Sequence, residues 1–256
     1  MQPSRTRPGG LPDVKDYQWD HPENDDGALD RYVRSLSDVK LLWDPGTRFA
    51  YSNIGFEILG DIIAHVSGVS FESYVASHIL EPLGMSTSTL LRTSVDTTLL
   101  AEGYTRPRDD MAAAFRRVAY PYNRMHGPSC DLFSIIVDMS RWALANLNRG
   151  ELDGTRILDR RAYDEMWRLV AAVEFCRPPG HTECRKTDVS VGLSWFLQRK
   201  DGRLIVSHSG GDDGFISQLV LIPDTGFAFI MMTNSDSAGI ALLKEIQAQA
   251  LALSTD

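Results

Sequence analysis

The first half of the chain spaces its apolar residues as helices do. Residues 28–36 show this pattern before a turn, and residues 53–66 carry apolar side chains every three or four positions. Gly68 follows as a C-terminal cap, because glycine readily adopts the left-handed conformation that ends many helices. Ser70 is a suitable N-cap for another helix over residues 71–80. The pattern therefore predicts a series of helices here.

The second half begins with more predicted helices, and then its pattern changes from helical periodicity to runs typical of strands. Ser134 is expected to cap a helix that ends at Gly150, and residues 159–170 form the next one. Beyond residue 190, runs rich in β-branched and aromatic residues are separated by KDG, GGDDG and PDTG, which are hairpin turn signals. These runs predict an antiparallel meander. Residues 240–253 predict a closing helix that covers one face of it.

The order of these elements predicts the fold class. Helices come first, and strands with one helix come last, which indicates an α+β fold whose helical region and antiparallel sheet meet at a cleft. A length of 256 residues, 43% of them hydrophobic, suits one domain over residues 1–256. Residues 1–26 are expected to be an extended entry loop, and residues 86–128 an irregular excursion.

Composition narrows the classes of partner. The formal net charge of -8 argues against a nucleic-acid partner, because phosphate binding relies on clustered Lys and Arg. No apolar run reaches the ~20 residues of a membrane span, and residues 1–13 lack the apolar core of a signal peptide. We therefore expect no membrane partner and a cytoplasmic location by default.

The cysteines raise the questions of a metal site and of a disulfide. Cys176, His181 and Cys184 lie close together in the sequence, but zinc normally takes a fourth protein ligand. We therefore expect no metal and no other cofactor. With Cys130 the chain has three cysteines, too few for a disulfide framework. The sequence leaves open whether Cys176 and Cys184 form a loop disulfide or remain free thiols.

Two short segments carry candidate chemistry. In PGTRFAYSNIGFEILGDII, Tyr51 and Asn53 stand where a loop turns into a buried helix, so the helix start projects both side chains in one direction. In SHSGGDDGF, a strand is expected to end in a tight turn at four successive residues: His208, Ser209, Gly210 and Gly211. Paired glycines let a substrate approach the backbone and leave N–H groups free to point at it. The adjacent Asp212 and Asp213 are expected to be solvated turn charges.

With these segments the chain resembles the serine β-lactamase and D-alanyl-D-alanine carboxypeptidase superfamily, in its class C and family VIII esterase branch. The resemblance runs along essentially the whole chain, through GGLPD, Pro45 to Asn53, EPLGM, DMSRWALANLNRGELDG, HSGG and the TN before the last helix. It implies a β-lactamase/transpeptidase-like fold and hydrolysis through an acyl-enzyme. Each piece is a weak signal, whereas their order and spacing together are strong.

The resemblance implies a role for each matching residue. Tyr51 and Asn53 match the family's Tyr-x-Asn element, so Tyr51 would be the proton shuttle and Asn53 a donor to the substrate. The Lys-Thr-Gly element, often His-x-Gly in this branch, matches three residues: His208, Ser209 and Gly210. The next residue, Gly211, would supply an oxyanion-hole N–H to the carbonyl oxygen that gains charge in the transition state.

The sequence departs from the family at the nucleophile. The family's Ser-x-x-Lys element should precede Tyr51 by some tens of residues, on a core helix that follows two N-terminal strands, and we expect these parts to be absent. The only Ser-x-x-Lys present is Ser37 to Lys40, after a predicted helix and in a polar run. Tyrosine needs nearby cations to act as a base near neutrality. Tyr51 without that lysine should stay a protonated phenol.

Three hypotheses follow from these residues. The first is a serine hydrolase domain that, in its complete form, acts on a small ester, amide, peptide or β-lactam and is weak or inactive as given. The second is a non-catalytic ligand-binding protein that keeps the cleft, and the third is an active enzyme that uses Ser37 and Lys40. Without its N-terminal strands the sheet would also expose an edge through which the chain could self-associate.

Overall fold

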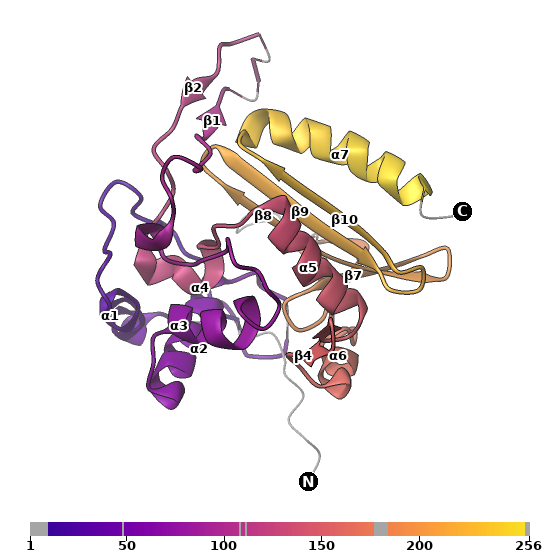
Figure 1. The fold of residues 1–256 in the computed structure, drawn as a ribbon, viewed down its shortest axis with the longest axis horizontal. Coiled ribbons are helices and arrows are strands. Elements are labelled where there is room, and N and C mark those ends of the chain that lie inside the picture. The colour runs from indigo at the N-terminus through magenta and orange to yellow at the C-terminus, as the bar shows by residue number, and fades with distance from the viewer. Residues whose placement is uncertain (1–9, 48, 108, 111, 177–183, 254–256) are drawn as a thin grey trace.

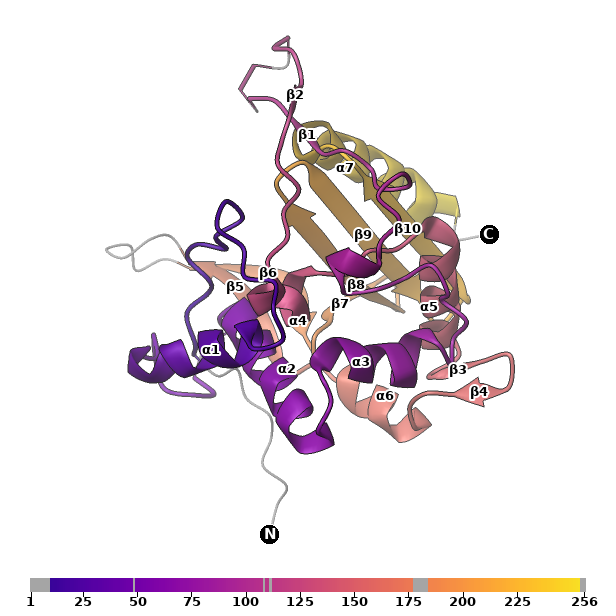
Figure 2. The same ribbon diagram turned by 60° about the vertical axis from the view of Figure 1, so that its left-hand side comes forward.

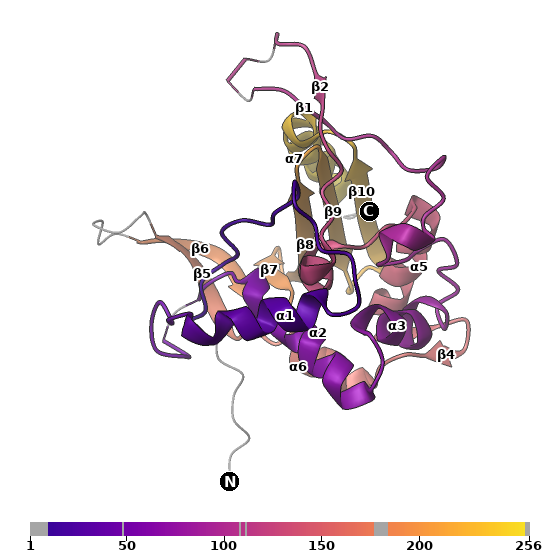
Figure 3. The same ribbon diagram turned by 90° about the vertical axis from the view of Figure 1, so that its left-hand side faces the viewer.

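The computed structural model describes residues 10–47, 49–107, 109–110, 112–176 and 184–253 (Figure 1). It contains a helical region, built mainly from the first half of the chain, and a large sheet formed by the last third. Figure 3 shows α1 to α3 gathered on one side, with β8 to β10 behind them. Helices and sheet are therefore segregated, as the order of the predicted elements indicated.

The helices follow the apolar periodicity of the sequence. Gly68 ends α2 with φ of 75°, and the Ser70 hydroxyl accepts a hydrogen bond of 3.2 Å from the Ser73 N–H at the start of α3. The residues after α3 continue as a short π-helix, Ala76–Leu80. The α-helices are Ala28–Ser35 (α1), Asn53–Ser67 (α2), Phe71–Val75 (α3), Gly127–Cys130 (α4), Ile136–Leu147 (α5), Arg160–Met166 (α6) and Asp236–Leu253 (α7).

One predicted cap is wrong. Ile135 occupies the N-cap position of α5, and no side chain caps that helix. The Ser134 hydroxyl lies 2.7 Å from the Ser88 hydroxyl instead, and Ser88 also donates to Asp138. Ser134 therefore joins the helix start to the loop that contains Ser88, a contact between distant residues that the local pattern did not reveal.

The large sheet is antiparallel and has the order β10-β9-β8-β7-β6-β5. Its strands are Ala171–Cys176 (β5), Cys184–Val191 (β6), Phe196–Lys200 (β7), Arg203–Asp212 (β8), Phe215–Ile222 (β9) and Phe227–Thr233 (β10). The meander from β7 to β10 was predicted, whereas β5 and most of β6 were not. Short pairs are formed by Tyr104–Thr105 (β1) with Arg116–Arg117 (β2), and by Glu151–Leu152 (β3) with Thr155–Arg156 (β4).

Helices cover both faces of this sheet. Both α5 and α7 contact β9 and β10, and they lie on opposite faces (Figure 2). The largest buried cluster joins α5 and α6 to the strands and contains Tyr163, Trp167, Trp195, Leu197 and Val206. A second cluster around Leu83 packs the end of the π-helix against α5. These two cores hold the helical region against β7 to β9, where the candidate site lies.

Among the described residues, no single helix has the length and apolar character needed to cross a membrane. A bent pair, Asn53–Ser67 with Phe71–Leu80, meets the criterion only when its two parts are taken together across a bend of 79°.

Candidate active site

The two segments singled out in the sequence meet in the structure. The ring of Tyr51, just before α2, lies 6.5 Å from the ring of His208 in β8, measured between centroids. The ring of Phe196 in β7 packs on His208 at 5.5 Å. Residues separated by more than 150 positions thus face each other where the helical region meets the sheet. This is the juxtaposition that the candidate site required.

The start of α2 is held by the N-terminal loop. Ser52 is its N-cap and accepts from the Gly55 N–H at 3.3 Å, while the Ser52 hydroxyl donates to the carbonyl of Pro12 at 2.7 Å. The Asn53 N–H donates to the Asp13 carboxylate at 2.8 Å. The loop that contains residues 12 and 13 therefore fixes the position from which Tyr51 and Asn53 project.

Tyr17 is a site residue that the sequence did not reveal. The Asn53 side-chain amide donates to the Tyr17 hydroxyl, so this amide already has a partner inside the protein. The Asn53 amide still has a second N–H and its carbonyl oxygen for a substrate, because a side-chain amide carries two donors and one acceptor oxygen. No local signal marked Tyr17, because its contact with α2 joins residues 36 positions apart.

Tyr51 and His208 are both uncharged near neutrality. Burial raises the pKa of Tyr51, and the acidic groups of Asp13, Cys130 and Asp212 act in the same direction. Burial also lowers the pKa of His208, because desolvation disfavours the imidazolium. The phenol is thus a hydrogen-bonding group and not a base in this structure, in line with the expectation drawn for Tyr51 without a nearby lysine.

The glycines lie inside β8 and do not end it, which corrects the predicted strand boundary. The strand continues to Asp212, and β9 accompanies it over that whole length. In contrast, β7 pairs with β8 only from Arg203 to Ser207. Among the described residues, positions 208–212 therefore have no strand neighbour on the β7 side. Alternate peptide groups along this open edge can point at a ligand.

Asp212 differs from the solvated turn charge that was expected. It is partly buried at the end of β8, and burial, aided by the charge of Asp213, raises its pKa to about 6. Asp213 is exposed, as predicted. Near the site, burial strongly raises the pKa of the Cys130 thiol, which therefore stays protonated. No sequence motif indicated that Asp212 and Cys130 lie within electrostatic range of Tyr51.

A buried polar network lies beneath α2. The Glu57 carboxylate accepts from the Ser129 hydroxyl at 2.6 Å and lies 3.2 Å from His126 Nδ1. Glu57 and His126 are fully buried, and the His126 ring packs edge-on against Tyr32 at 4.6 Å. Burial raises the pKa of Glu57 despite these partners. The network joins α2 to α4, and α4 carries Cys130.

The alternative nucleophile pair lies on the surface. Ser37 is exposed in a short 3-10 helix, Leu36–Asp38, directly after α1, and Lys40 is exposed beyond it. This is the end of a helix, as the sequence indicated, whereas the family's Ser-x-x-Lys opens a helix. The use of this pair in catalysis remains a prediction.

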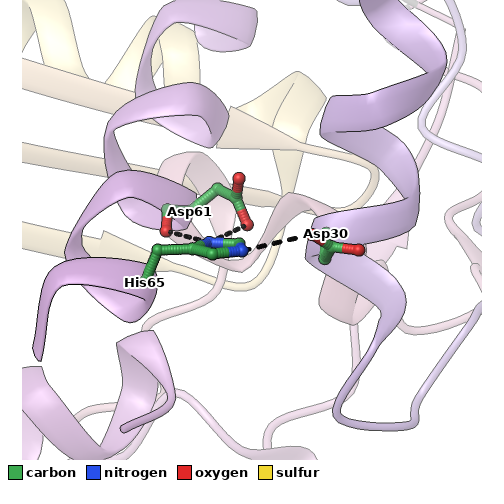
Figure 4. Close-up of side chains that lie close together, drawn as sticks. All are labelled: Asp30, Asp61 and His65. Carbon is green, nitrogen blue, oxygen red and sulfur yellow. Dashed lines mark hydrogen bonds and ion pairs between the residues drawn. The ribbon is translucent and has the colours of Figure 1, made fainter. Parts of the chain in front are cut away.

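Two groups of side chains have the chemistry of metal ligands. His181 of the Cys176, His181 and Cys184 group lies outside the described residues, while the backbones of Cys176 and Cys184 pair across β5 and β6. The structure brings Asp30, Asp61 and His65 together on α1 and α2 (Figure 4).

The arrangement in Figure 4 favours ionic contacts that join α1 to α2 over a metal site. Asp61 faces Nδ1 of His65 at 3.3 Å, whereas Asp30 faces Nε2 at 3.4 Å. One ion cannot bind both nitrogens of one ring. A protonated His65 can instead donate through Nδ1 to the Asp61 backbone carbonyl at 2.9 Å, beside the Asp61 carboxylate, and face the Asp30 carboxylate through Nε2.

Comparison with known proteins identifies the family. A family model described as Beta-lactamase matches residues 7–253. The chain belongs to the beta-lactamase family. The superfamily resemblance inferred from the sequence motifs is thereby confirmed.

Among curated relatives of this beta-lactamase family protein, D-alanyl-D-alanine-carboxypeptidase/endopeptidase AmpH from Escherichia coli K12 is 28% identical over 237 residues. The match covers 90% of this chain and 55% of AmpH. Putative beta-lactamase-like 1 from Homo sapiens is 27% identical over 208 residues, which is 80% of this chain and 38% of the human protein. The chain therefore spans about half or less of the length of these relatives.

Solved structures confirm the predicted fold. The octameric penicillin-binding protein homologue from Pyrococcus abyssi superposes with a TM-score of 0.75 at 24% identity, over 97% of this chain and 54% of that one. The D-amino acid amidase from Ochrobactrum anthropi SV3, complexed with L-phenylalanine amide, superposes with a TM-score of 0.73 at 20% identity. The match covers 98% of this chain and 71% of the amidase chain. At such identities the likeness is evidence of fold only.

Proposed function

We propose that this chain forms most of the acyl-transfer site of a serine hydrolase that acts on a small ester, amide or peptide. The proposal rests on the 6.5 Å distance between the ring centroids of Tyr51 and His208, which lie beside the open edge of β8. Family membership and the similarity to a carboxypeptidase support the same reaction class.

Each residue has a role in this proposal. The substrate carbonyl lies along residues 208–212, where the N–H of Gly211 binds the oxygen that becomes negative during attack. Tyr51 relays the proton between the attacking serine and the leaving group. Asn53 binds a substrate amide or carbonyl, while His208 and Ser209 shape the wall next to Gly210.

The proposal assigns the nucleophile to a Ser-x-x-Lys element that the longer protein supplies next to Tyr51. A lysine at that point would favour the ionised phenol and oppose the burial that now raises the pKa of Tyr51. In this proposal a gene product that carries such an element is the catalytic form, and the 256-residue chain by itself has weak activity or none.

Fluorophosphonate labelling followed by peptide mapping tests this assignment. The 256-residue chain should not be labelled, and a longer gene product that carries an in-frame Ser-x-x-Lys should be labelled at that serine. Its Tyr51→Phe variant should lose most labelling, whereas Tyr104→Phe, on β1 outside the candidate site, serves as the matched control. Labelling of Ser37 in the short chain would refute the proposal in favour of Ser37 and Lys40. Absence of labelling in the longer product would also refute it.

A second candidate function is a binding protein without catalysis. It is favoured by the raised pKa of Tyr51, which leaves the phenol a hydrogen-bond donor with no means of activating a serine. Saturable binding of a dipeptide by the longer product, together with absent labelling, would select this function.

A further inference from the structure

The two edges of the large sheet differ in their protection against another strand. One edge is β5, which carries Glu174 and a register shift between Ala172 and Glu174. The other edge is β10, which pairs with β9 over seven consecutive residues and, among the described residues, has no strand on its other side. Native proteins protect edge strands with charges, prolines or bulges. Phe227–Thr233 has no charged residue and no proline, so β10 is an unprotected edge.

Both faces of β10 are apolar. Ala228 and Ile230 pack against the buried cluster that contains Ala143 of α5. Phe227 and Phe229 pack against a different buried cluster, formed by β8 and β9. Successive side chains of a strand point to opposite faces of the sheet, and α5 and α7 cover these two faces. A strand that adds to this edge extends the same two faces, so apolar side chains suit it on both sides.

The helix that runs along β10 has an uncharged face. The exposed residues of α5 are Ile136, Val137, Ser140 and Leu144, and the three apolar ones expose 49%, 62% and 48% of their surface. At about 100° per residue, these four lie opposite Trp142, which packs into the buried cluster of the helical region. The uncharged face of α5 therefore points away from that region.

This face and the open edge belong to the same side of the molecule. Figure 2 shows α5 beside β10, at the side of the sheet far from β5 and β6. A helix surface that faces solvent normally carries charged or polar side chains, and a larger exposed apolar patch marks an interaction surface. An open strand edge and an uncharged helix face thus lie together, and each favours contact with another chain.

The chain itself contains a strand that suits this edge. Of the six strands in the large sheet, β9 and β10 are the two without a charged residue, and β9 is already paired on both sides. A two-fold axis perpendicular to the sheet would place β10 of a second copy antiparallel to β10. The same axis keeps the two α5 helices on one face of the joined sheet, so their uncharged faces meet. Neither β10 nor this face of α5 brings like charges together.

We propose that the 256-residue chain forms a symmetric dimer in which the β10 strands of two copies pair and the uncharged faces of their α5 helices pack together. Stable interfaces bury roughly 1,200–2,000 Å² in total, so the helix faces must add to the area that the strands bury. The surface does not include Tyr51 or His208. The proposal therefore goes beyond the proposed function and does not depend on it.

Analytical ultracentrifugation of the 256-residue chain tests the proposal. Interfaces of this size have dissociation constants from micromolar to picomolar, so concentrations up to about 100 µM cover the weakest case. The chain should sediment with twice the mass of one chain at the upper end of this range. A single-chain mass at every concentration would overturn the proposal and leave the edge to a strand from a different protein.

Variants locate the interface. Met232 in β10 is 43% exposed, so Met232→Lys should fold normally, and in the dimer it would place an unpaired charge in the interface. The dissociation constant should rise by at least about tenfold. Leu144→Lys should have the same effect through α5. Val66→Lys is the matched control, because Val66 lies on α2 and is 83% exposed. A dimer that survives both Met232→Lys and Leu144→Lys would refute the proposal.

Two further measurements report on the kind of contact. Backbone amides of β10 should exchange hydrogen more slowly in the dimer than in the monomer, because strand pairing gives them new partners. Each chain has a formal net charge of -8, so added salt should screen the repulsion between copies and tighten the dimer. Unchanged exchange in β10, or a dimer that weakens as salt is added, would contradict an uncharged interface at this edge.

Discussion

The buried ion pair between Arg124 and Glu72 offers a quantitative test of the packing around the site. Arg124 Nε donates to Glu72 Oε1 at 2.7 Å, and Arg124 Nη1 donates to the Asp26 carboxylate at 2.6 Å and to the Asn24 carbonyl at 3.3 Å. Arg124 and Glu72 are each only 9% exposed. This one guanidinium therefore ties α3 to the N-terminal loop that also contains Tyr17.

Replacement of Arg124 by methionine keeps the apolar stem but leaves Glu72 buried and unpaired. Breaking a buried ion pair in this way costs about 3–5 kcal/mol. For a protein of this size, each kcal/mol lowers Tm by about 2–4 °C, so the loss should be about 10 °C. The exposed pair of Arg34 and Asp30 is the control, because such surface pairs contribute only about 0–1 kcal/mol.

Thermal unfolding followed by circular dichroism, on four proteins, checks this prediction: the parent chain, Arg124→Met, Arg34→Met and the double variant Arg124→Met with Glu72→Leu. The double variant should recover most of the loss, because no uncompensated charge remains buried.

Although burial opposes ionisation of Glu72, Arg124 lowers its pKa, so the pair stabilises the fold at pH values above the ordinary glutamate pKa. The deficit of Arg124→Met should shrink as pH falls through the lowered value. Equal Tm losses for Arg124→Met and Arg34→Met would refute the reasoning.

Three further predictions concern single positions. Asp131→Asn should raise Tm more at pH 8.5 than at pH 4.5, because a carboxyl pKa raised from 3.8 to about 8 makes the folded state lose stability across that range. The hydrogen bond to the Asp61 carbonyl raises the pKa of His65, so the parent chain should lose Tm as His65 loses its proton between pH 6 and pH 8.5. Melts recorded across this pH range should show that His65→Gln abolishes the loss. Gly192→Ala should destabilise in urea titration by more than about 1 kcal/mol, since its Cβ would lie 2.1 Å from the Met166 carbonyl oxygen, whereas Gly55→Ala meets no close contact.

Much of the fold could be predicted because its signals are local. The helix over residues 53–67 shows its periodicity and its Gly68 cap within one stretch of sequence, and the hairpin turns after residue 200 are equally local. Most of β6 escaped prediction because polar and charged residues interrupt its apolar pattern, whereas β5 has only one charged residue and follows directly on the run predicted as a helix over residues 159–170. The supposed cap at Ser134 failed because a distant serine, Ser88, competes for its hydroxyl.

The residues of the candidate site likewise fall into those that local motifs predicted and those that they did not. Tyr51, Asn53 and residues 208–211 were found from short motifs, since each motif places its chemistry within a few positions. Tyr17 and Cys130 carried no such motif, and they lie at or near the site only because the chain folds back on itself. Their burial is a property of neighbours supplied by other elements, which a linear pattern does not contain.

The amino-acid sequence by itself determined the class of fold, the family and the two motifs that face each other, because hydrophobic periodicity and turn chemistry act over a few residues. Only the tertiary structure decided that burial and nearby acidic groups raise the pKa of Tyr51, that β8 has an open edge, and that Asp131 Oδ2 is buried without a hydrogen bond. These properties depend on desolvation and on charges that come together through space. The chemistry of the candidate site is therefore determined by packing between segments that are distant in the sequence.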